Sequence, residues 1–316
     1  MNRPIAIAFL AALAVSASVP ALAAPNAYVP NEGSATISVI DTATDRVAST
    51  LKVGGKPRGI AVSADGARLF VSDQKANAIV VHDLAKGTEL ARLSVGDSPE
   101  AIYLSPDGRW LAVAVEENDL VAIVDAKALT VARRIKMKGK NPEHAVWSPD
   151  GKWLYVSAEN ANSVDVVDVA AGEVVASIVV GERPRGIAFT PDGTRAYVAA
   201  ENANQVAVID VAKREVITQI KAGLRSNGVT MNPDGKQVYV TSGGDATVQV
   251  IDTSTNAIVE AIPVGKRPWN MAITPDGAKL YVACGRSSQV AVIDTKSRKK
   301  IADVDVGELP WGVAIR

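Results

Sequence analysis

The sequence predicts an all-β protein, a seven-bladed β-propeller in which seven four-stranded antiparallel blades form a closed ring. Three observations predict this fold. An aspartate that ends runs such as VIDT recurs at Asp41, Asp83, Asp125, Asp168, Asp210, Asp252 and Asp294. A glycine recurs with it, at Gly54, Gly96, Gly139, Gly181, Gly223, Gly265 and Gly307; in both series one step is 43 residues and the others are 42. Apolar and polar residues alternate within each unit, as in half-buried strands. Four short strands in each of seven such repeats are typical of a propeller.

The strands of one unit follow a fixed order, which residues 186–223 illustrate. The first strand, GIAFT, ends at the turn PDG, where proline presets a backbone angle and glycine relieves the tight return. The second strand is RAYVAA and the third is QVAVID, and the polar loop ENAN separates them. The aspartate that ends the third strand is expected to cap the next turn with its side-chain oxygens. The fourth strand, EVITQIKAG, leads to the next unit. One extra residue between Asp125 and Gly139 predicts a longer turn or a bulge there.

Each end of the chain supplies part of one blade. The C-terminal segment WGVAIR reads as a first strand alone, and the residues after position 24 supply the other three strands. We therefore expect a C-terminal strand to complete the N-terminal blade and close the ring, in a propeller domain of residues 24–316.

Residues 1–23 read as a signal peptide rather than as part of the fold. Arg3 precedes an apolar run from Ile5 to Val15, and Ala21-Leu22-Ala23 supplies small residues for cleavage. The predicted location is periplasmic. The apolar run is too short for a membrane span, and no later segment is long enough. Cys284 is the only cysteine, which excludes an internal disulfide, and we expect it to be buried.

Charge balance limits the classes of partner. Lysine plus arginine and aspartate plus glutamate each number 34. No strong field therefore attracts nucleic acid or an anionic membrane. A partner has to be recognised locally, and the sequence suggests a monomer.

The second strands carry FVSD, YVSA, YVAA, YVTS and YVAC, with PRGIA, PDG and VIDT around them. These motifs resemble the YVTN-type β-propeller repeat over essentially the whole chain after the signal. In its signal, repeat number and length, the chain looks most like propeller proteins associated with pyrroloquinoline quinone (PQQ)-dependent alcohol catabolism. The resemblance implies a periplasmic protein without a cofactor of its own. It would bind a partner protein or a small ligand, including a component of a PQQ-dependent dehydrogenase system.

Positions that differ between blades are the candidates for function, because the scaffold needs the same residue in every blade. Just after the link into each first strand, where the side chains should crowd the channel mouth, the candidates are Arg58, Glu100, Glu143, His144, Arg185, Asn227, Trp269, Asn270 and Trp311. Arginines and tryptophans in one ring could hold a small anionic, partly aromatic or cyclic ligand. Alternatively, Arg58 pairs with Glu100 and Arg185 with Glu143, and the charges simply neutralise one another.

A second varied set follows the second strands on the same face: Glu32, Gln74, Glu116, Glu159, Glu201, Gly243 and Gly285. Its glutamates could bind a metal or a basic protein. We expect instead a solvated acidic rim and no metal site, because residues contributed one per blade should diverge outward.

Enzymatic signals are few. His82 occupies a third-strand position held by Ile or Val in other blades, which predicts a packed residue, and His144 is the only candidate base. No nucleophile elbow or metalloprotease motif accompanies it. The sequence therefore favours a non-catalytic binding module with no catalytic residues. The alternative is a metal-dependent hydrolase or lactonase with its site in the central channel.

Overall fold

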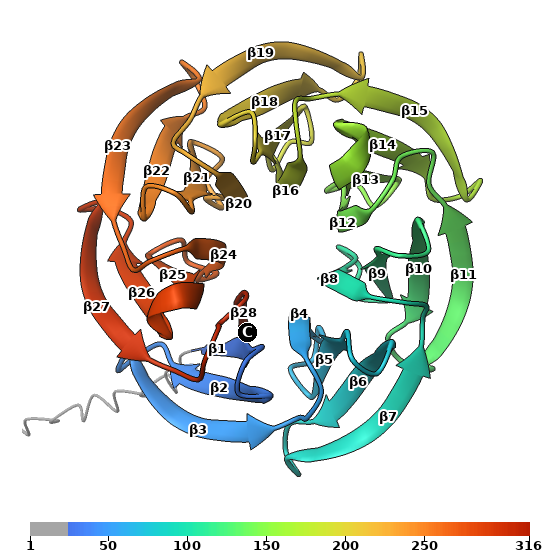
Figure 1. Cartoon of the computed structure of the whole chain (residues 1–316), viewed down its shortest axis with the longest axis vertical. Coiled ribbons are helices and arrows are strands. Elements are labelled where there is room, and N and C mark those ends of the chain that lie inside the picture. The colour runs from blue at the N-terminus through green and yellow to red at the C-terminus, as the bar shows by residue number, and fades with distance from the viewer. Residues whose placement is uncertain (1–24) are drawn as a thin grey trace, which may run out of the picture.

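A computed structural model describes residues 25–316, and the predicted signal peptide, residues 1–23, lies outside the described residues. The described chain forms a ring of seven four-stranded sheets around a central axis (Figure 1). Every strand pairing within a sheet is antiparallel. The prediction of an all-β, seven-bladed propeller is confirmed.

Each blade contributes strands in four positions, from the channel to the rim. The innermost are β4 (Pro57–Val62), β8 (Pro99–Leu104), β12 (Pro142–Trp147), β16 (Pro184–Phe189), β20 (Ser226–Met231), β24 (Pro268–Ile273) and β28 (Ala314–Ile315). Next come β1 (Asn26–Asn31), β5 (Arg68–Asp73), β9 (Trp110–Val115), β13 (Trp153–Ala158), β17 (Arg195–Ala200), β21 (Gln237–Ser242) and β25 (Lys279–Cys284). The third are β2 (Thr36–Asp41), β6 (Ala78–Asp83), β10 (Leu120–Asp125), β14 (Ser163–Asp168), β18 (Gln205–Asp210), β22 (Thr247–Asp252) and β26 (Gln289–Asp294). The outermost are β3 (Arg46–Lys52), β7 (Thr88–Ser94), β11 (Thr130–Lys136), β15 (Glu173–Val179), β19 (Glu215–Lys221), β23 (Ala257–Pro263) and β27 (Lys299–Asp305).

Two single-turn 3₁₀ helices, η1 (Glu159–Ala161) and η2 (Gly285–Ser287), follow second strands. Among residues 25–316 there is no helix with the length and apolar character needed to cross a membrane.

The ring closes as expected. Strand β28 pairs with β1, with Ile315 opposite Ala27 and Ala314 opposite Tyr28. Backbone hydrogen bonds from Trp311 N to Pro30 O and from Arg316 N to Asn26 O extend the junction on either side. The C-terminal strand thereby completes the N-terminal blade, and the ring has no open end between its first and last blades.

The repeated aspartates shape the turns between third and fourth strands. In all seven blades the carboxylate accepts a hydrogen bond from a backbone N–H two or three residues later, as Asp41 does from Ala43 and Asp294 from Ser297. These bonds satisfy amides that the turn would otherwise leave unpaired, so the predicted capping role is confirmed.

The core lies between blades as well as within them. The aromatic residue of the second-strand motif is fully buried at Phe70, Tyr155, Tyr197, Tyr239 and Tyr281. Tyr155, for example, packs with Ile187 and Phe189 of the following blade. Each blade therefore stabilises its neighbour, which explains why the motif repeats. Cys284 and His82 are also buried, as predicted.

Glycine after the arginine in PRG permits the innermost strands to approach one another. A Cβ on Gly59 would lie 2.2 Å from the backbone oxygen of Glu100, and one on Gly186 would lie 2.6 Å from the backbone nitrogen of Val229. Any larger residue would force neighbouring blades apart. This close approach brings the side chains of adjacent blades together at the channel mouth.

The single extra residue of the repeat lies in the link between β11 and β12. This link holds residues 137–141, whereas the links that lead to β4, β8, β16, β20 and β24 hold four residues, such as 53–56. The backbone N–H groups of Lys138 and Gly139 both donate to Asp165 Oδ2, at 2.7 Å each. The longer turn is therefore tied to the blade that follows it.

Candidate functional site

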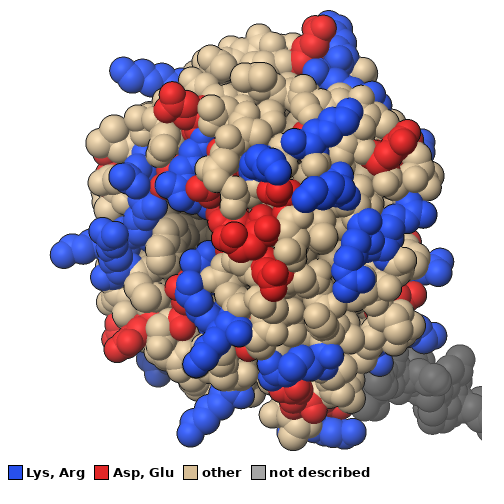
Figure 2. All heavy atoms as spheres, turned by 45° about the vertical axis from the view of Figure 1, so that its right-hand side comes forward, with Lys and Arg blue, Asp and Glu red and all other residues tan. Residues whose placement is uncertain are grey.

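A pocket of about 480 Å³ opens at the channel mouth, on the face where the links and the loops after the second strands meet. We call it the funnel. It is lined by Glu32, Lys56, Arg58, Gln74, Ser98, Glu116, Glu143, His144, Glu159, Arg183, Arg185, Asn227, Arg267, Trp269, Asn270 and Trp311. Figure 2 shows acidic side chains gathered beside the central hollow with basic side chains around them. The funnel is thus a strongly polar site with both signs of charge.

The structure brings the nine sequence-predicted residues together. Eight of them line the funnel: Arg58, Glu143, His144, Arg185, Asn227, Trp269, Asn270 and Trp311. The ninth, Glu100, is fully buried and is bonded to Arg58. They converge because six of them are the second residue of an innermost strand, where the strand begins at the channel mouth.

Arg58 joins three blades. Its Nη1 donates to Glu100 Oε1 at 2.7 Å, and its Nε donates to Glu32 Oε2 at 2.8 Å. Burial opposes the charge of Arg58, but Glu100 and Glu32 outweigh it and raise its pKa above the ordinary value. The guanidinium is therefore permanently charged and fixed between two carboxylates.

Arg185 is the centre of a second network. It contacts Glu143 through Nη1, Glu159 Oε2 at 3.0 Å and Glu201 Oε2 at 2.9 Å. Glu201 also accepts from Arg267 at 2.7 Å, across two blades. Both ion pairs considered from the sequence, Arg58–Glu100 and Arg185–Glu143, are present.

The expectation of a solvated acidic rim is wrong. The side chain of Glu201 is fully buried, and those of Glu159 and Glu32 are only 11% and 13% exposed. The loops that carry these residues place the carboxylates against the arginines of the innermost strands. Glutamates from after the second strands therefore belong to the same site as residues of the innermost strands.

The sequence-based candidates omitted several lining residues, notably Lys56, Glu159, Arg183 and Arg267. A signal for two of them exists in the sequence, because Arg183 and Arg267 directly precede the link proline. Both adopt a left-handed backbone conformation, with φ of 58° and 54°. Ser98, Asn141, Arg225 and Leu309 adopt the same conformation at the equivalent positions of other blades, so it belongs to the repeat.

Glu143 and Glu159 form a pair of carboxyl groups with opposed pKa shifts. Burial favours the neutral form of Glu143, but the charge of Arg185 and a hydrogen bond from Glu159 outweigh it and lower its pKa to about 2. Burial, together with the hydrogen bond to Glu143, raises the pKa of Glu159 to about 7. Glu143 is therefore ionised at neutral pH, whereas Glu159 titrates near neutrality, the range that suits a general base.

His144 is neutral and held in one orientation. Its Nδ1 lies 2.7 Å from the hydroxyl oxygen of Tyr103. Its ring stacks on Trp311 with 6.1 Å between centroids and 15° between planes. Burial lowers the pKa of His144 to about 4, against the opposing charge of Glu143. His144 and Trp311 form a flat wall of the funnel.

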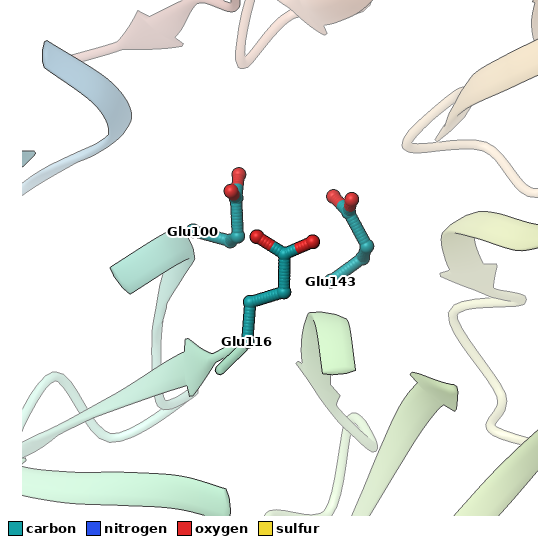
Figure 3. A group of neighbouring side chains, drawn as sticks. All are labelled: Glu100, Glu116 and Glu143. Carbon is teal, nitrogen blue, oxygen red and sulfur yellow. The ribbon is translucent and has the colours of Figure 1, made fainter. Parts of the chain in front are cut away.

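Three carboxylates converge at one side of the funnel. Glu100, Glu116 and Glu143 each place one oxygen within 4.8 Å of the other two (Figure 3). These are the residues that could hold a cation. The sequence did not indicate this convergence, because Glu116 follows a second strand whereas the other two belong to innermost strands.

Comparison with solved structures supports the fold. A chain of hydrazine synthase from Kuenenia stuttgartiensis aligns with a TM-score of 0.79 and 24% identity, covering 91% of this chain and 99% of that chain. A candidate 6-phosphogluconolactonase from Bacteroides fragilis aligns with a TM-score of 0.78 and 20% identity, covering 95% and 100%. The dihydro-heme d1 dehydrogenase NirN aligns with a TM-score of 0.69 and 16% identity, covering 94% and 77%. At these identities the likeness concerns the fold. None of the curated proteins matches this chain.

The sequence itself matches a family model described as "Lactonase, 7-bladed beta-propeller", over residues 88–177 and 171–305. This match overturns the expectation of a non-catalytic binding module and favours the alternative, a hydrolase or lactonase. The expectation failed because the glutamates after the second strands were taken to diverge, whereas they converge on the arginines. Since the two matched segments together cover more than half of the chain, this protein belongs to the lactonase, seven-bladed β-propeller family.

Proposed function

We propose that this protein hydrolyses a lactone, an internal ester, in the funnel. The observation that carries the proposal is the lactonase family match over residues 88–305. That segment contains most of the funnel, including Glu143, Glu159, Arg185 and Trp269. The family and the position of the polar residues therefore point to the same place on the ring.

Ester hydrolysis needs a base for the attacking water and donors for the oxyanion that forms on the carbonyl. Glu159 is suited to the first role, because its carboxyl group lines the funnel. Arg183 and Arg185 are suited to the second. Glu159 Oε1 lies 2.8 Å from Arg183 Nε, and its Oε2 lies 3.0 Å from Arg185 Nη1. A water on the carboxylate and a carbonyl on the guanidinium groups would be neighbours, which is the arrangement that accelerates attack.

The remaining lining residues suit a cyclic substrate. Trp269 and Trp311 offer flat apolar surfaces to the face of a ring, and Asn227 and Asn270 place amides beside them. Amides can bind ring hydroxyls in either sense, since they donate and accept. The funnel therefore fits a hydroxylated lactone better than a long-chain ester.

We further propose that this hydrolase is exported and works beside PQQ-dependent alcohol oxidation. The apolar run from Ile5 to Val15, the following Ala21-Leu22-Ala23, and the resemblance to the YVTN-type and PQQ-associated repeats support this context. Oxidation of a cyclic hemiacetal yields a lactone, and a lactonase would open it.

The test is hydrolysis of hydroxylated γ- and δ-lactones, such as glucono-δ-lactone, followed by acid release. The wild-type protein should open at least one ring size faster than buffer. Glu159→Gln keeps the size of the side chain and removes the base, so kcat should fall by about two orders of magnitude.

Glu182→Gln is the matched control, because Glu182 is an exposed glutamate of the neighbouring link that does not line the funnel. Its rate should equal that of the wild type. If neither ring size is opened above the buffer rate, or if Glu159→Gln retains the full rate, the proposal is wrong.

A further inference from the structure

We propose that Glu100, Glu116 and Glu143 bind one divalent cation, with calcium preferred, at the side of the funnel. The inference goes beyond lactone hydrolysis, because the ion should bind whether or not a lactone is the substrate. It departs from the sequence-based expectation that no residue of the chain ligates a metal.

The geometry matches a calcium ion without movement of the backbone. One oxygen from each glutamate lies within 4.8 Å of the other two. Calcium–oxygen bonds of about 2.3–2.6 Å place ligands on opposite sides of the ion about 4.6–5.2 Å apart. Magnesium usually keeps several waters and is bound through one or two carboxylates, so three converging protein carboxylates favour calcium. Figure 3 shows the three carboxylates directed toward a common space, from β8, from the end of β9 and from β12.

An independent observation is an oxygen of Glu100 without a donor. The side chain is fully buried. Its Oε1 accepts from Arg58 at 2.7 Å and from the Gln74 amide, whereas Oε2 has no hydrogen-bond partner among residues 25–316. Buried carboxylate oxygens are nearly always satisfied, and an orphan is costly. A cation would satisfy it.

The local charge also favours a cation. Three carboxylates meet two guanidinium groups, since Arg58 pairs with Glu100 and Arg185 with Glu143. The carboxylates of Glu100, Glu116 and Glu143 lie close enough together to repel one another. A divalent ion would relieve this repulsion. Oxygen ligands alone select calcium, magnesium or manganese rather than softer metals.

Glu116 is the ligand best suited to mutation. It directly follows β9 and is partly exposed, so its replacement should leave the core intact. Ser98 Oγ donates to its Oε2 at 2.9 Å, which fixes the orientation of the carboxylate. Hydrogen bonds of this kind around a ligand contribute to metal affinity.

The experiment is calorimetric titration of the chelator-treated full-length protein with calcium chloride. We expect one calcium per chain and a rise in the thermal midpoint at saturating calcium. Glu116→Gln should weaken binding at least tenfold and abolish the thermal shift. Glu117→Gln, which removes the same charge from the neighbouring exposed residue, should bind as the wild type does.

The inference fails if the wild type takes up no stoichiometric calcium at millimolar concentration. In that case the orphan oxygen holds a proton or water. It also fails if Glu116→Gln binds as tightly as the wild type, because the ion would then lie elsewhere. Neither result depends on lactone hydrolysis, which is measured separately with and without chelator.

Discussion

The two faces of the ring are stabilised by different kinds of interaction. On the face opposite the funnel, five of the turns after innermost strands repeat one device, in which a serine or threonine hydroxyl donates to the aspartate two residues later. On the funnel face, interacting residues lie 42 positions apart, as in Arg58–Glu100 and Glu143–Arg185, or 66 apart, as in Glu201–Arg267. The repeated turns of the first face are stabilised locally, although side chains such as Arg68 and Arg195 also donate to the neighbouring blade there. The second face couples blades to one another.

The difference has an energetic meaning. The turn aspartates are exposed, and hydrogen bonds at such positions contribute about 1 kcal/mol or less each. The funnel network is buried, so removal of one partner leaves an uncompensated charge that costs about 3–5 kcal/mol. Substitutions on the two faces should therefore differ in stability even where the number of hydrogen bonds lost is similar.

The largest loss of stability is expected when the ring can no longer close, because closure supports both faces. Deletion of residues 311–316 removes β28, its backbone hydrogen bonds to β1, and the bond between Trp311 and Asn270 of β24. At about 1 kcal/mol for each bond, with the apolar contacts added, the loss should reach about 5 kcal/mol or more. Urea unfolding measures it. A midpoint unchanged from the full-length protein would show that closure does not stabilise the ring.

The second-largest loss of stability is expected from a substitution on the funnel face. Arg185→Ala leaves Glu143 buried without its guanidinium partner and removes one of the guanidinium groups that pair with Glu201, so it should lower the free energy of unfolding by about 3–5 kcal/mol. Glu89→Ala is the control, because within the described chain the only ion pair of Glu89 is the exposed one with Arg92. Arg92 pairs with Glu89 at a similar distance of 2.8 Å, but both side chains are 42% exposed, so the loss should be below about 1 kcal/mol. If chemical denaturation shows the same loss of unfolding free energy for both variants, the proposed difference between buried and exposed pairs is wrong.

The smallest loss of stability is expected on the face opposite the funnel, and this loss depends on pH. The hydrogen bond from Ser105, followed by one from the Arg109 backbone, lowers the pKa of Asp107. Because the folded pKa is depressed, this contribution is present above the ordinary pKa near 4 and is lost as pH falls through the folded value. Ser105→Ala should cost about 1 kcal/mol at pH 7 and less at pH 2.

Ser148→Thr is the control for the serine substitution. Thr190 and Thr274 make the same bond to their aspartates in other blades, so this exchange should change stability by less than about 0.5 kcal/mol. Carboxyl titration by NMR should show the pKa of Asp107 rising in Ser105→Ala. An unshifted pKa would mean that the hydroxyl does not set it.

The same contrast explains what the sequence could predict. Blade number, strand order, ring closure and the capping aspartates follow from spacing and local turn chemistry. The pairs Arg58–Glu100 and Arg185–Glu143 follow because equivalent positions of adjacent blades are neighbours. The convergence of Glu159 and Glu201 on Arg185 does not follow, because neither the repeat spacing nor local turn chemistry specifies the three-dimensional course of these loops. That omission also led the sequence-based interpretation away from catalysis.

Strand β28 has two residues, whereas the other strands have six or seven. The junction that it makes is therefore the thinnest in the ring, and its residues are only partly buried. Transient opening should begin at this seam, so amide hydrogens of Asn26 and Trp311 should exchange with deuterium earlier than those between the middle blades. We therefore expect the strand that closes the ring to open before the other innermost strands do.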